Sequence, residues 1–235
     1  MDVTPDLLRS FALLSTLPRS TLDELAPASR VEKIARRGIA VDPDDTESVC
    51  FLFEGRLQGI DFTIDGKEVG LFFVESGDFC GETTLFDELA KPEYVIALSQ
   101  SLVVKVPTRY LRSIMLKNPP VMNLLAKRLA SRIKQLTAQR SLLAISNVKQ
   151  RVCCQLWMLL AETYENSAEQ LQQSCEITNP PTHLEIANML SISRESVTRV
   201  FQTLQNRQIV RRNGANSLIV SRPAELRGLA EGEKL

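Results

Sequence analysis

The chain has 235 residues, of which 44% are hydrophobic and 24% charged, as in a globular protein of one large or two modest domains. No apolar run approaches the roughly 20 residues of a membrane span, and residues 1–6 lack the basic and then apolar order of a signal peptide. We therefore expect a cytoplasmic protein with no membrane partner.

The formal net charge is zero, but the charges are distributed unevenly. Residues 1–110 carry 11 basic and 19 acidic side chains, whereas residues 111–147 carry seven basic and no acidic ones. Residues 182–235 are also basic, with eight Lys or Arg against five Asp or Glu. Because an acidic front half repels phosphate, any contact with nucleic acid is expected at the C-terminal end.

Short apolar helical patterns occupy residues 5–30, and the pattern then changes to β-rich runs between about residues 31 and 106. Gly and Asp turns separate these runs, which include Val49–Phe53, Arg56–Ile64, Val69–Val74, Tyr94–Ser99 and Leu102–Val106. Asp65-Gly66 between two of the runs is a hairpin signal. Many short strands at about ten-residue spacing predict a small barrel or roll, which we place within residues 1–110.

The five cysteines, at positions 50, 80, 153, 154 and 175, form no CxxC pair and show no metal-ligand spacing. An odd number of cysteines in a cytoplasmic chain argues against a disulfide framework. We expect buried free thiols, and a redox sensor remains as the alternative. The sequence predicts no metal site.

A long helix is predicted within residues 111–147. Its apolar stripe recurs at steps of three and four residues, through Met122, Leu125, Leu129, Ile133, Leu136, Arg140 and Leu143. A narrow stripe on a helix of this length favours pairing with a second copy, so we expect a homodimer held by residues of about 118–145. The alternative is that the helix packs against its own roll.

A hinge is predicted near Ser146-Asn147, because Asn147 and Gln150 have the spacing of a capping box before a further helix. We expect the C-terminal domain to span residues 148–235. Residues 164–181 are polar and end in Asn-Pro-Pro, which indicates a connection rather than core.

The segment from Thr182 to Arg199 predicts two short helices that meet at a tight corner. Apolar residues recur at helical spacing on either side of the break, and Ser193 is placed to cap the second helix. The first two turns of that helix present Arg194, Glu195 and Arg199 away from its apolar face. Arg reads guanine and Glu accepts from cytosine in the major groove, so the segment predicts recognition of double-stranded DNA. A hairpin wing with Arg211 and Arg212 follows, placed to reach backbone phosphate.

This order of elements resembles the CRP/FNR superfamily of bacterial transcription regulators, from about residue 10 to 228. In the front half the resemblance rests on Gly55, Gly66, Gly77-Asp78 and above all the run Gly81–Phe86, which resembles the family's phosphate-binding cassette. The resemblance implies an α+β fold with an N-terminal cyclic-nucleotide-binding-like β-roll that senses an effector, a long dimerisation helix and a C-terminal winged helix-turn-helix. It also implies a homodimeric, allosteric regulator that contacts RNA polymerase and is not an enzyme.

In the DNA-binding half, Arg194–Arg199 is similar to the recognition helix of the cAMP receptor branch. The resemblance assigns Arg194, Glu195 and Arg199 to bases and implies palindromic half-sites like TGTGA. Candidates for contacts with DNA phosphate are Thr182, Ser193, Ser196, Arg211 and Arg212.

The effector pocket departs from the cAMP-binding pattern. The Arg-Ser pair that holds the cyclic phosphate in that branch corresponds to Lys91 and Pro92, and the Thr-Ser pair that touches adenine corresponds to Leu136 and Thr137. Glu82 matches the ribose contact, although a structural cap or a buried hydrogen-bond partner is an equal alternative. The candidate pocket residues are Gly81, Glu82, Thr83, Thr84, Lys91, Arg132 and Thr137. We expect cAMP to bind poorly or not at all, because a lysine lacks the guanidinium fork and proline lacks the hydroxyl.

The effector itself stays open. The iron–sulfur branch needs clustered N-terminal cysteines, and the haem-sensing branches commonly use histidine, whereas the only histidine is His183, expected at the surface or on the DNA backbone. An anionic small molecule or a cyclic dinucleotide fits the basic residues of 111–147. Effector-independent and redox-responsive regulation are the alternatives. An enzyme that uses Glu82, Asp87 and Glu88 is disfavoured, because no nucleophile–base pair accompanies them.

Overall fold

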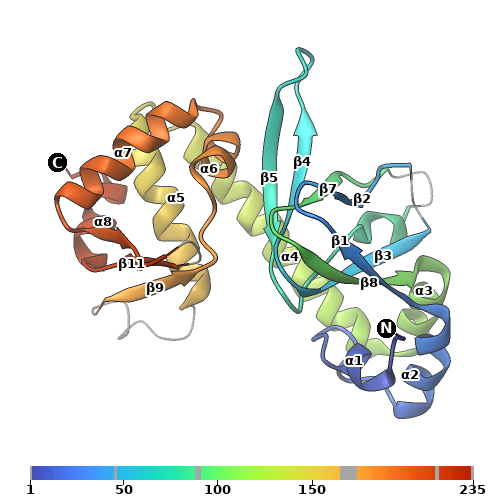
Figure 1. Cartoon of the computed structure of the whole chain (residues 1–235). Helices are drawn as coiled ribbons and strands as arrows, with labels where there is room; N and C mark the ends of the chain where they lie inside the picture. The colour runs from blue at the N-terminus through green and yellow to red at the C-terminus, as the bar shows by residue number, and fades with distance from the viewer. Residues whose placement is uncertain (1, 45–46, 88–90, 165–173, 215–216, 234–235) are drawn as a thin grey trace. The chain divides into compact units, whose positions relative to one another are not determined.

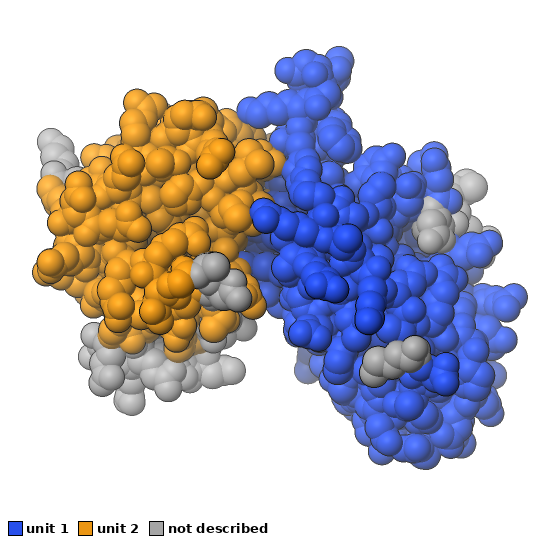
Figure 2. Space-filling model, in the orientation of Figure 1, with its two compact units in different colours: residues 1–136 blue, residues 137–235 orange. Residues whose placement is uncertain are grey.

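A computed structural model describes residues 2–44, 47–87, 91–164, 174–214 and 217–233, and it divides the chain into two compact units. Unit 1 comprises residues 1–136 and unit 2 comprises residues 137–235 (Figure 2). The division falls inside helix α4 (Pro119–Leu143), within the segment predicted to join two domains. No helix in the described part of the chain is long and apolar enough to cross a membrane.

Unit 1 is built on two four-stranded antiparallel sheets (Figure 1). The strands are β1 (Arg30–Ile34), β2 (Ile39–Val41), β3 (Ser48–Glu54), β4 (Leu57–Phe62), β5 (Glu68–Val74), β6 (Phe79–Cys80), β7 (Tyr94–Ala97) and β8 (Ser101–Pro107). One sheet has the order β1-β8-β3-β6 and the other β2-β7-β4-β5. The predicted β-roll is confirmed, with three further strands at its edges.

The hairpin predicted at Asp65-Gly66 is present between β4 and β5. Gly66 has φ +77°, a left-handed conformation that a residue with a side chain rarely adopts. The backbone amide of Thr63 donates to the Lys67 carbonyl at 3.0 Å and closes the turn. The turn chemistry thus favours the register in which β4 and β5 pair.

The interior of the roll lies between the two sheets. Its buried side chains come from seven strands and include Ala40, Val41, Cys50, Leu52, Leu57, Phe72, Val74, Cys80, Val95, Ala97 and Val103. Along β3 the residues between these, Val49 and Phe51, point the opposite way into a second core. Alternation along a strand sends successive side chains to opposite faces, which explains why β3 is buried almost throughout.

The second core covers the outer face of the β1-β8-β3-β6 sheet with helices. These are α1 (Pro5–Arg9), α2 (Arg19–Leu25), η1 (Ala26–Ala28), α3 (Thr108–Lys117) and the start of α4. Leu125 on α4 is fully buried there, and Met122 and Leu129 pack against the same cluster. The N-terminal half of the predicted dimer stripe therefore packs against its own roll, as in the alternative.

Unit 2 contains the helices α5 (Val148–Thr163), α6 (His183–Leu190), α7 (Arg194–Asn206) and α8 (Pro223–Glu231). A sheet of order β10-β11-β9 completes it, from β9 (Cys175–Thr178), β10 (Val210–Arg212) and β11 (Ser217–Val220). The predicted wing is the β10–β11 hairpin. The interpretation of residues 164–181 as a mere connection is wrong at β9, where Cys175 and Ile177 are 3% exposed and pair with β11, while residues 165–173 lie outside the described part.

Asn147 caps α5, as expected: its side-chain oxygen accepts from the backbone amides of Lys149 and Gln150 at 3.0 and 3.3 Å. The predicted reciprocal bond from Gln150 is not made. Its side-chain amide donates instead to the Ala230 carbonyl at 3.1 Å, which ties α5 to α8. The Gln150 side chain thus forms a tertiary hydrogen bond instead of the capping bond that the local pattern predicted.

Candidate DNA-binding face and effector pocket

Helix α6 begins with a complete capping box. The Thr182 hydroxyl accepts from the Glu185 amide at 3.3 Å, and the Glu185 carboxylate accepts from the Thr182 amide at 2.8 Å. Thr182 was predicted to contact DNA phosphate, and its T-x-x-E spacing to Glu185 is also the sequence signal of this capping box. The cap fixes the start of α6, and the hydroxyl proton of Thr182 is still able to donate to an incoming phosphate.

The corner between α6 and α7 is tight because Ser191 adopts a left-handed conformation, with φ +52°. Ser193 then caps α7, as predicted, by accepting from the Ser196 amide at 3.2 Å. The two hydroxyls of Ser193 and Ser196 lie 3.0 Å apart. Both serines, proposed to contact phosphate, are therefore grouped at the exposed start of the second helix.

One face of α7 is buried and the other is charged. Val197, Val200, Phe201 and Leu204 are buried against the rest of unit 2, whereas Arg194, Glu195 and Arg199 are exposed. The Arg199 guanidinium reaches only the Ser196 hydroxyl, at 3.4 Å. The structure thus brings the three predicted base-reading residues together at one solvent-facing end of a packed helix. Arg211 and Arg212 are exposed on β10.

His183, expected at the surface or on the DNA backbone, is half-buried and contacts residues of α7. Its ring lies 4.4 Å from that of Phe201, centroid to centroid, and its Nδ1 is 3.0 Å from the Thr198 hydroxyl oxygen. Thr198 donates its own proton to the Arg194 carbonyl at 3.0 Å, so His183 donates from Nδ1 to Thr198. Burial, with smaller contributions from Arg212 and Arg194, lowers the pKa of His183, which favours this neutral form.

The cassette in unit 1 is a short 3-10 turn, η2 (Glu82–Leu85), that follows Gly81 at φ +81°. The Thr84 hydroxyl donates to the Gly81 carbonyl at 2.9 Å and closes the turn. Glu82 is 5% exposed and Thr84 is 2% exposed, whereas Thr83 is exposed. Four of the seven candidate pocket residues meet here: Gly81, Glu82, Thr84 and Arg132.

Arg132 reaches from α4 into the cassette and is itself buried. Its guanidinium lies 3.2 Å from the Glu82 carboxylate, and their side chains are 8% and 6% exposed. It also donates to the Phe79 carbonyl at 3.1 Å and lies 3.7 Å from Asp78. Its Nε has no hydrogen-bond partner among the described residues. One buried N–H donor of the Arg132 side chain is therefore unsatisfied by the described residues.

The contact between Arg132 and the Phe72 ring depends on a glycine. The guanidinium carbon of Arg132 lies 4.2 Å from the centre of the Phe72 ring, within cation–π range. The ring lies directly on Gly59 of the neighbouring strand, where an added Cβ would lie 2.5–2.7 Å from three ring atoms. Phe72 therefore occupies its position only because residue 59 has no side chain.

A second arginine on α4, one turn earlier, is also bound to the roll. Arg128 forms a two-pronged salt bridge with Asp78, with Nε 2.8 Å from one carboxylate oxygen and a terminal nitrogen on the other. These side chains are 21% and 19% exposed, so this pair is more solvated than the Arg132–Glu82 pair. Two of the basic residues of segment 111–147 therefore neutralise acids of the roll.

The ionisation of Glu82 is set by two opposed effects. Burial raises the pKa of Glu82, and the positive charge of Arg132 opposes that rise. The nearby acids Asp78 and Glu93 add a smaller upward contribution to the Glu82 pKa. Loss of Arg132 would therefore leave a buried carboxyl that favours its protonated form.

The structure does not bring Lys91 or Thr137 to this cluster. The Lys91 ammonium forms a salt bridge of 2.7 Å with Asp44, and both side chains are more than 70% exposed. This bond is the main cause of a raised pKa for Lys91. Pro92 is buried, and Thr137 is exposed within unit 2. In this structure Arg132 supplies the positive charge beside the cassette.

Two cysteines face each other inside the roll, a pairing that spacing in the sequence did not reveal. Cys50 on β3 lies opposite Cys80 on β6, and both are fully buried. The hydrogen bond to Cys50 and then burial raise the pKa of Cys80 well above its ordinary value. Burial also raises the pKa of Cys153 to about 12. These thiols stay protonated, so they lack the thiolate that a reactive cysteine needs.

No described group of three or more His, Cys, Asp or Glu side chains is arranged to hold a metal ion.

On α4, the C-terminal half of the predicted stripe is exposed to solvent. Ile133, Leu136 and Leu143 are 65%, 40% and 37% exposed.

Two family models match the chain. The Cyclic nucleotide-binding domain matches residues 39–118, and the Crp-like helix-turn-helix domain matches residues 150–229. Together they cover more than half of the sequence. They correspond to β2–β8 of the roll with helix α3, and to the four helices and wing of unit 2.

The chain is also similar to characterised regulators. It is 27% identical over 177 residues to the cAMP-activated global transcriptional regulator CRP of Pasteurella multocida, covering 75% of this chain and 82% of that protein. It is 26% identical over 219 residues to the cAMP-activated global transcriptional regulator Vfr of Pseudomonas aeruginosa, covering 88% and 97%.

Solved structures share the fold. FixK2 from Bradyrhizobium japonicum superposes with a TM-score of 0.72 at 16% identity, covering 88% of this chain and 99% of that one. The c-di-GMP responsive global regulator CLP of Xanthomonas campestris superposes with a TM-score of 0.64 at 20% identity, covering 87% and 99%.

Proposed function

Because the chain belongs to the CRP/FNR superfamily of transcription regulators, we propose that it is a homodimeric, sequence-specific DNA-binding regulator controlled by an anionic effector other than cAMP. Residues 1–110 would sense the effector, residues 111–147 would dimerise, and residues 148–235 would bind DNA. Family members are transcription regulators rather than enzymes, and a contact with RNA polymerase is part of this proposal.

The single observation that carries the proposal is the charged end of α7. Arg194, Glu195 and Arg199 are exposed on a helix whose other face is anchored in the core of unit 2. A rigid helix with two arginines and a glutamate at its start has the donors for guanine and the acceptor for cytosine. These side chains support half-sites like TGTGA, with Ser193, Ser196, Arg211 and Arg212 on phosphate.

A dimer is supported by the uncovered half of the α4 stripe. Leu136 and Leu143 lie two turns apart, seven residues along the helix, and both remain exposed in the chain. Seven-residue spacing places them on one face of α4, which is the geometry of a coiled-coil seam. A dimer whose seam runs through this half would present two recognition helices to a palindrome.

The effector class follows from the charges around Glu82. Arg132 already forms a salt bridge with Glu82, and the buried Nε of Arg132 is a donor with no acceptor among the described residues. A ligand with an anionic group would satisfy that donor, and a hydroxyl on the same ligand would suit Glu82. A cyclic dinucleotide or a smaller organic anion fits this description, and the CLP protein from Xanthomonas campestris is described as responsive to c-di-GMP. Redox control is disfavoured because the buried thiols are protonated.

The DNA-binding part is tested by selecting bound duplexes from a randomised pool. We expect an inverted repeat of TGTGA, and Arg199→Ala should cost about 1–3 kcal/mol per half-site and relax one base preference. Arg207→Ala removes the same charge just beyond the end of α7 and serves as the control. An unrelated motif, or equal loss in both variants, would overturn the assignment.

The effector part is tested by calorimetry with cAMP and with cyclic di-GMP, each in the presence and absence of operator DNA. We expect no micromolar binding of cAMP. A true effector should bind more tightly when DNA is present, because coupling between two sites is reciprocal. Micromolar binding of cAMP would refute the exclusion, and full operator affinity regardless of any anion would favour the effector-independent alternative.

A further inference from the structure

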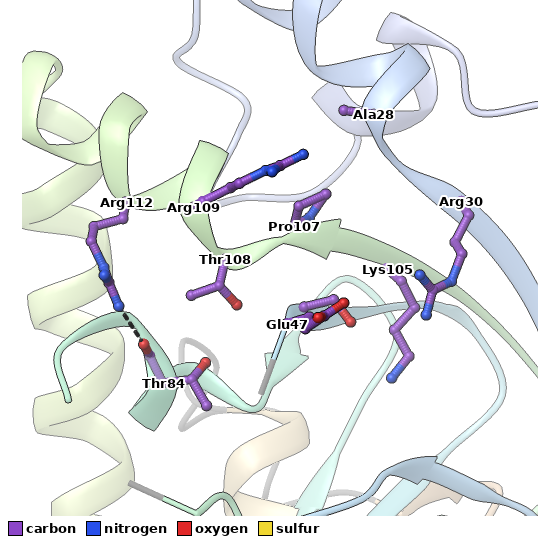
Figure 3. Close-up of a pocket in the computed structure, with 10 residues that line it drawn as sticks. Ala28, Arg30, Glu47, Thr84, Lys105, Pro107, Thr108, Arg109 and Arg112 are labelled. Carbon is purple, nitrogen blue, oxygen red and sulfur yellow. Dashed lines mark hydrogen bonds between the residues drawn. The ribbon is translucent and has the colours of Figure 1, made fainter. Parts of the chain in front are cut away.

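A cavity lies in unit 1, beside the turn η2 of the cassette. It has a volume of about 450 Å³ and is lined by η1, β1, β8, η2 and the start of α3 (Figure 3). The charged residues in its wall are Arg30, Lys105, Arg109, Arg112 and Glu47. We propose that this cavity binds a small phosphate-bearing molecule, at a site distinct from the Glu82–Arg132 cluster.

The concentration of positive charge is unusual for this part of the chain. Residues 1–110 carry 19 acidic and only 11 basic side chains, yet three of those basic residues, Arg30, Lys105 and Arg109, converge on the cavity. Arg112 adds a fourth. The carboxylates beside these cations are Glu47 in the wall and Glu32, which forms a salt bridge of 2.6 Å with Arg30. Figure 3 shows Arg30 and Lys105 on one side of this group of residues and Arg109 and Arg112 on the other, with the Arg112 guanidinium directed at Thr84. Such convergence creates a local positive potential that attracts an anion.

Lys105 is the strongest indication that an anion belongs here. The residue is only 4% exposed, and its ammonium donates to the backbone carbonyl of Ala40. No carboxylate among the described residues forms a salt bridge with Lys105. A buried charge is costly unless it is paired, and a neutral carbonyl leaves the positive charge of Lys105 uncompensated.

A buried hydroxyl points the same way. Ser48, in the cavity wall, is 5% exposed, and its Oγ has no hydrogen-bond partner among the described residues. Thr84 and Thr108 also line this wall, and the Thr84 hydroxyl already donates to the Gly81 carbonyl. A phosphate group, with several acceptor oxygens, satisfies such a mixture of hydroxyl and cationic donors better than a single carboxylate does.

The start of α3 adds a third element. This ten-residue helix begins at the cavity after Pro107, with no side-chain cap and no acidic residue in its first turn. The positive end of its dipole therefore faces the space that the arginines and lysine surround. The volume, within the usual 300–1,000 Å³ of small-molecule sites, favours a compact ligand over a flat protein contact.

The cavity is connected to the cassette through one side chain. Arg112 donates to the carbonyl of Leu85 at 3.0 Å and to that of Thr84 at 2.8 Å, both in the same turn as Glu82 (Figure 3). A phosphate that draws Arg112 toward the cavity would compete with these two bonds. Ligand binding at this site would then weaken the hydrogen bonds that Arg112 makes to turn η2, which carries Glu82.

The test uses the full-length protein and inorganic pyrophosphate as probe, with NaCl added to hold ionic strength constant. We expect one pyrophosphate per chain by calorimetry. The double variant Arg30→Gln, Arg109→Gln should bind at least tenfold more weakly, because it removes two exposed cations without opening the core. Lys117→Gln, which removes one charge at the far end of α3, should bind as the wild type does.

A second readout locates the site. The only tryptophan, Trp157, lies in unit 2, so its fluorescence follows that unit, while circular dichroism follows both. Pyrophosphate should raise the unfolding midpoint of unit 1 and leave the Trp157 transition in place. The proposal is overturned if the double variant binds like the wild type or Lys117→Gln loses as much. It is equally overturned if citrate matches pyrophosphate, or if only an acidic peptide binds. None of these readouts involves DNA, so they are independent of the proposed function.

Discussion

Replacement of Arg132 by Met tests whether the buried contact with Glu82 stabilises unit 1. The substitution keeps much of the side-chain volume but leaves a carboxylate that is 6% exposed without its cation. Removal of one partner from a buried ion pair typically costs about 3–5 kcal/mol, and loss of the contact with Phe72 contributes to that figure. With a urea m-value of about 2 kcal/mol/M, the unfolding midpoint of unit 1 should fall by roughly 1.5–2.5 M.

Arg128→Met is the matched control, one turn earlier on the same helix. Its partner Asp78 is 19% exposed and still has Arg132 at 3.7 Å, so about 1–3 kcal/mol of destabilisation is expected. In both variants the Trp157 transition of unit 2 should not move. Unfolding would be followed by circular dichroism and by fluorescence in parallel.

A double-mutant cycle decides whether the effect belongs to the pair. Glu82→Gln removes the charge that Arg132 neutralises, so the double variant should be about 2 kcal/mol more stable than the sum of the single losses predicts. The pKa of Glu82, already raised by burial, should rise further in Arg132→Met. The reasoning fails if Arg132→Met costs less than 1 kcal/mol or if the two substitutions are additive.

Three further predictions concern the dimer, the histidine and the thiols. Leu136→Lys puts a charge into the exposed half of the α4 stripe and should give monomers in sedimentation. The control Leu116→Lys, at a residue that is 75% exposed on α3, should leave the dimer intact, and equal effects of the two substitutions would reject the proposed α4 seam. The pKa of His183 is lowered in the folded state, so the unfolded state binds the proton more tightly, and the stability of unit 2 should fall as the pH drops below about 6.5. His183→Gln should abolish that pH dependence of the Trp157 transition, and an unchanged slope would contradict the assignment. Iodoacetamide should label only Cys154 in the native protein, since the other four cysteines are buried; rapid labelling of Cys50 or Cys80, read by mass spectrometry, would revive a redox role.

The sequence was sufficient wherever local periodicity and caps determine the structure. Five of the eight strands of the roll, the Asp65-Gly66 turn and the helix pair capped at Ser193 were predicted, because each depends on residues close in the chain. The short edge strands β1, β2 and β6 were not. Such local patterns do not predict contacts between residues that are far apart in the sequence. Cys50 meets Cys80 and Arg132 meets Glu82 only after the strands and α4 have packed.

One interpretation failed because it relied on local composition. Residues 175–178 were treated as connection because their neighbours are polar, yet β9 completes a sheet with strands more than 30 residues away. The assignment of Lys91 to the pocket rests on its position in the family pattern and stays a prediction, although its ammonium lies 2.7 Å from Asp44 in this structure. The α4 stripe was continuous in the sequence, although its two halves have different surroundings: Leu125 is fully buried in unit 1 and Leu136 is 40% exposed.

The double-sided burial of β3 has a consequence for how unit 1 opens. Val49 and Phe51 belong to the core beneath the helices, while Cys50 and Leu52 belong to the core between the sheets. Because β3 contributes side chains to both cores, a movement of β3 that exposes one core to solvent also removes side chains from the other core. The backbone amides of β3 should therefore exchange with deuterium only through opening of the whole unit, and the two cores should show a single protection free energy rather than two.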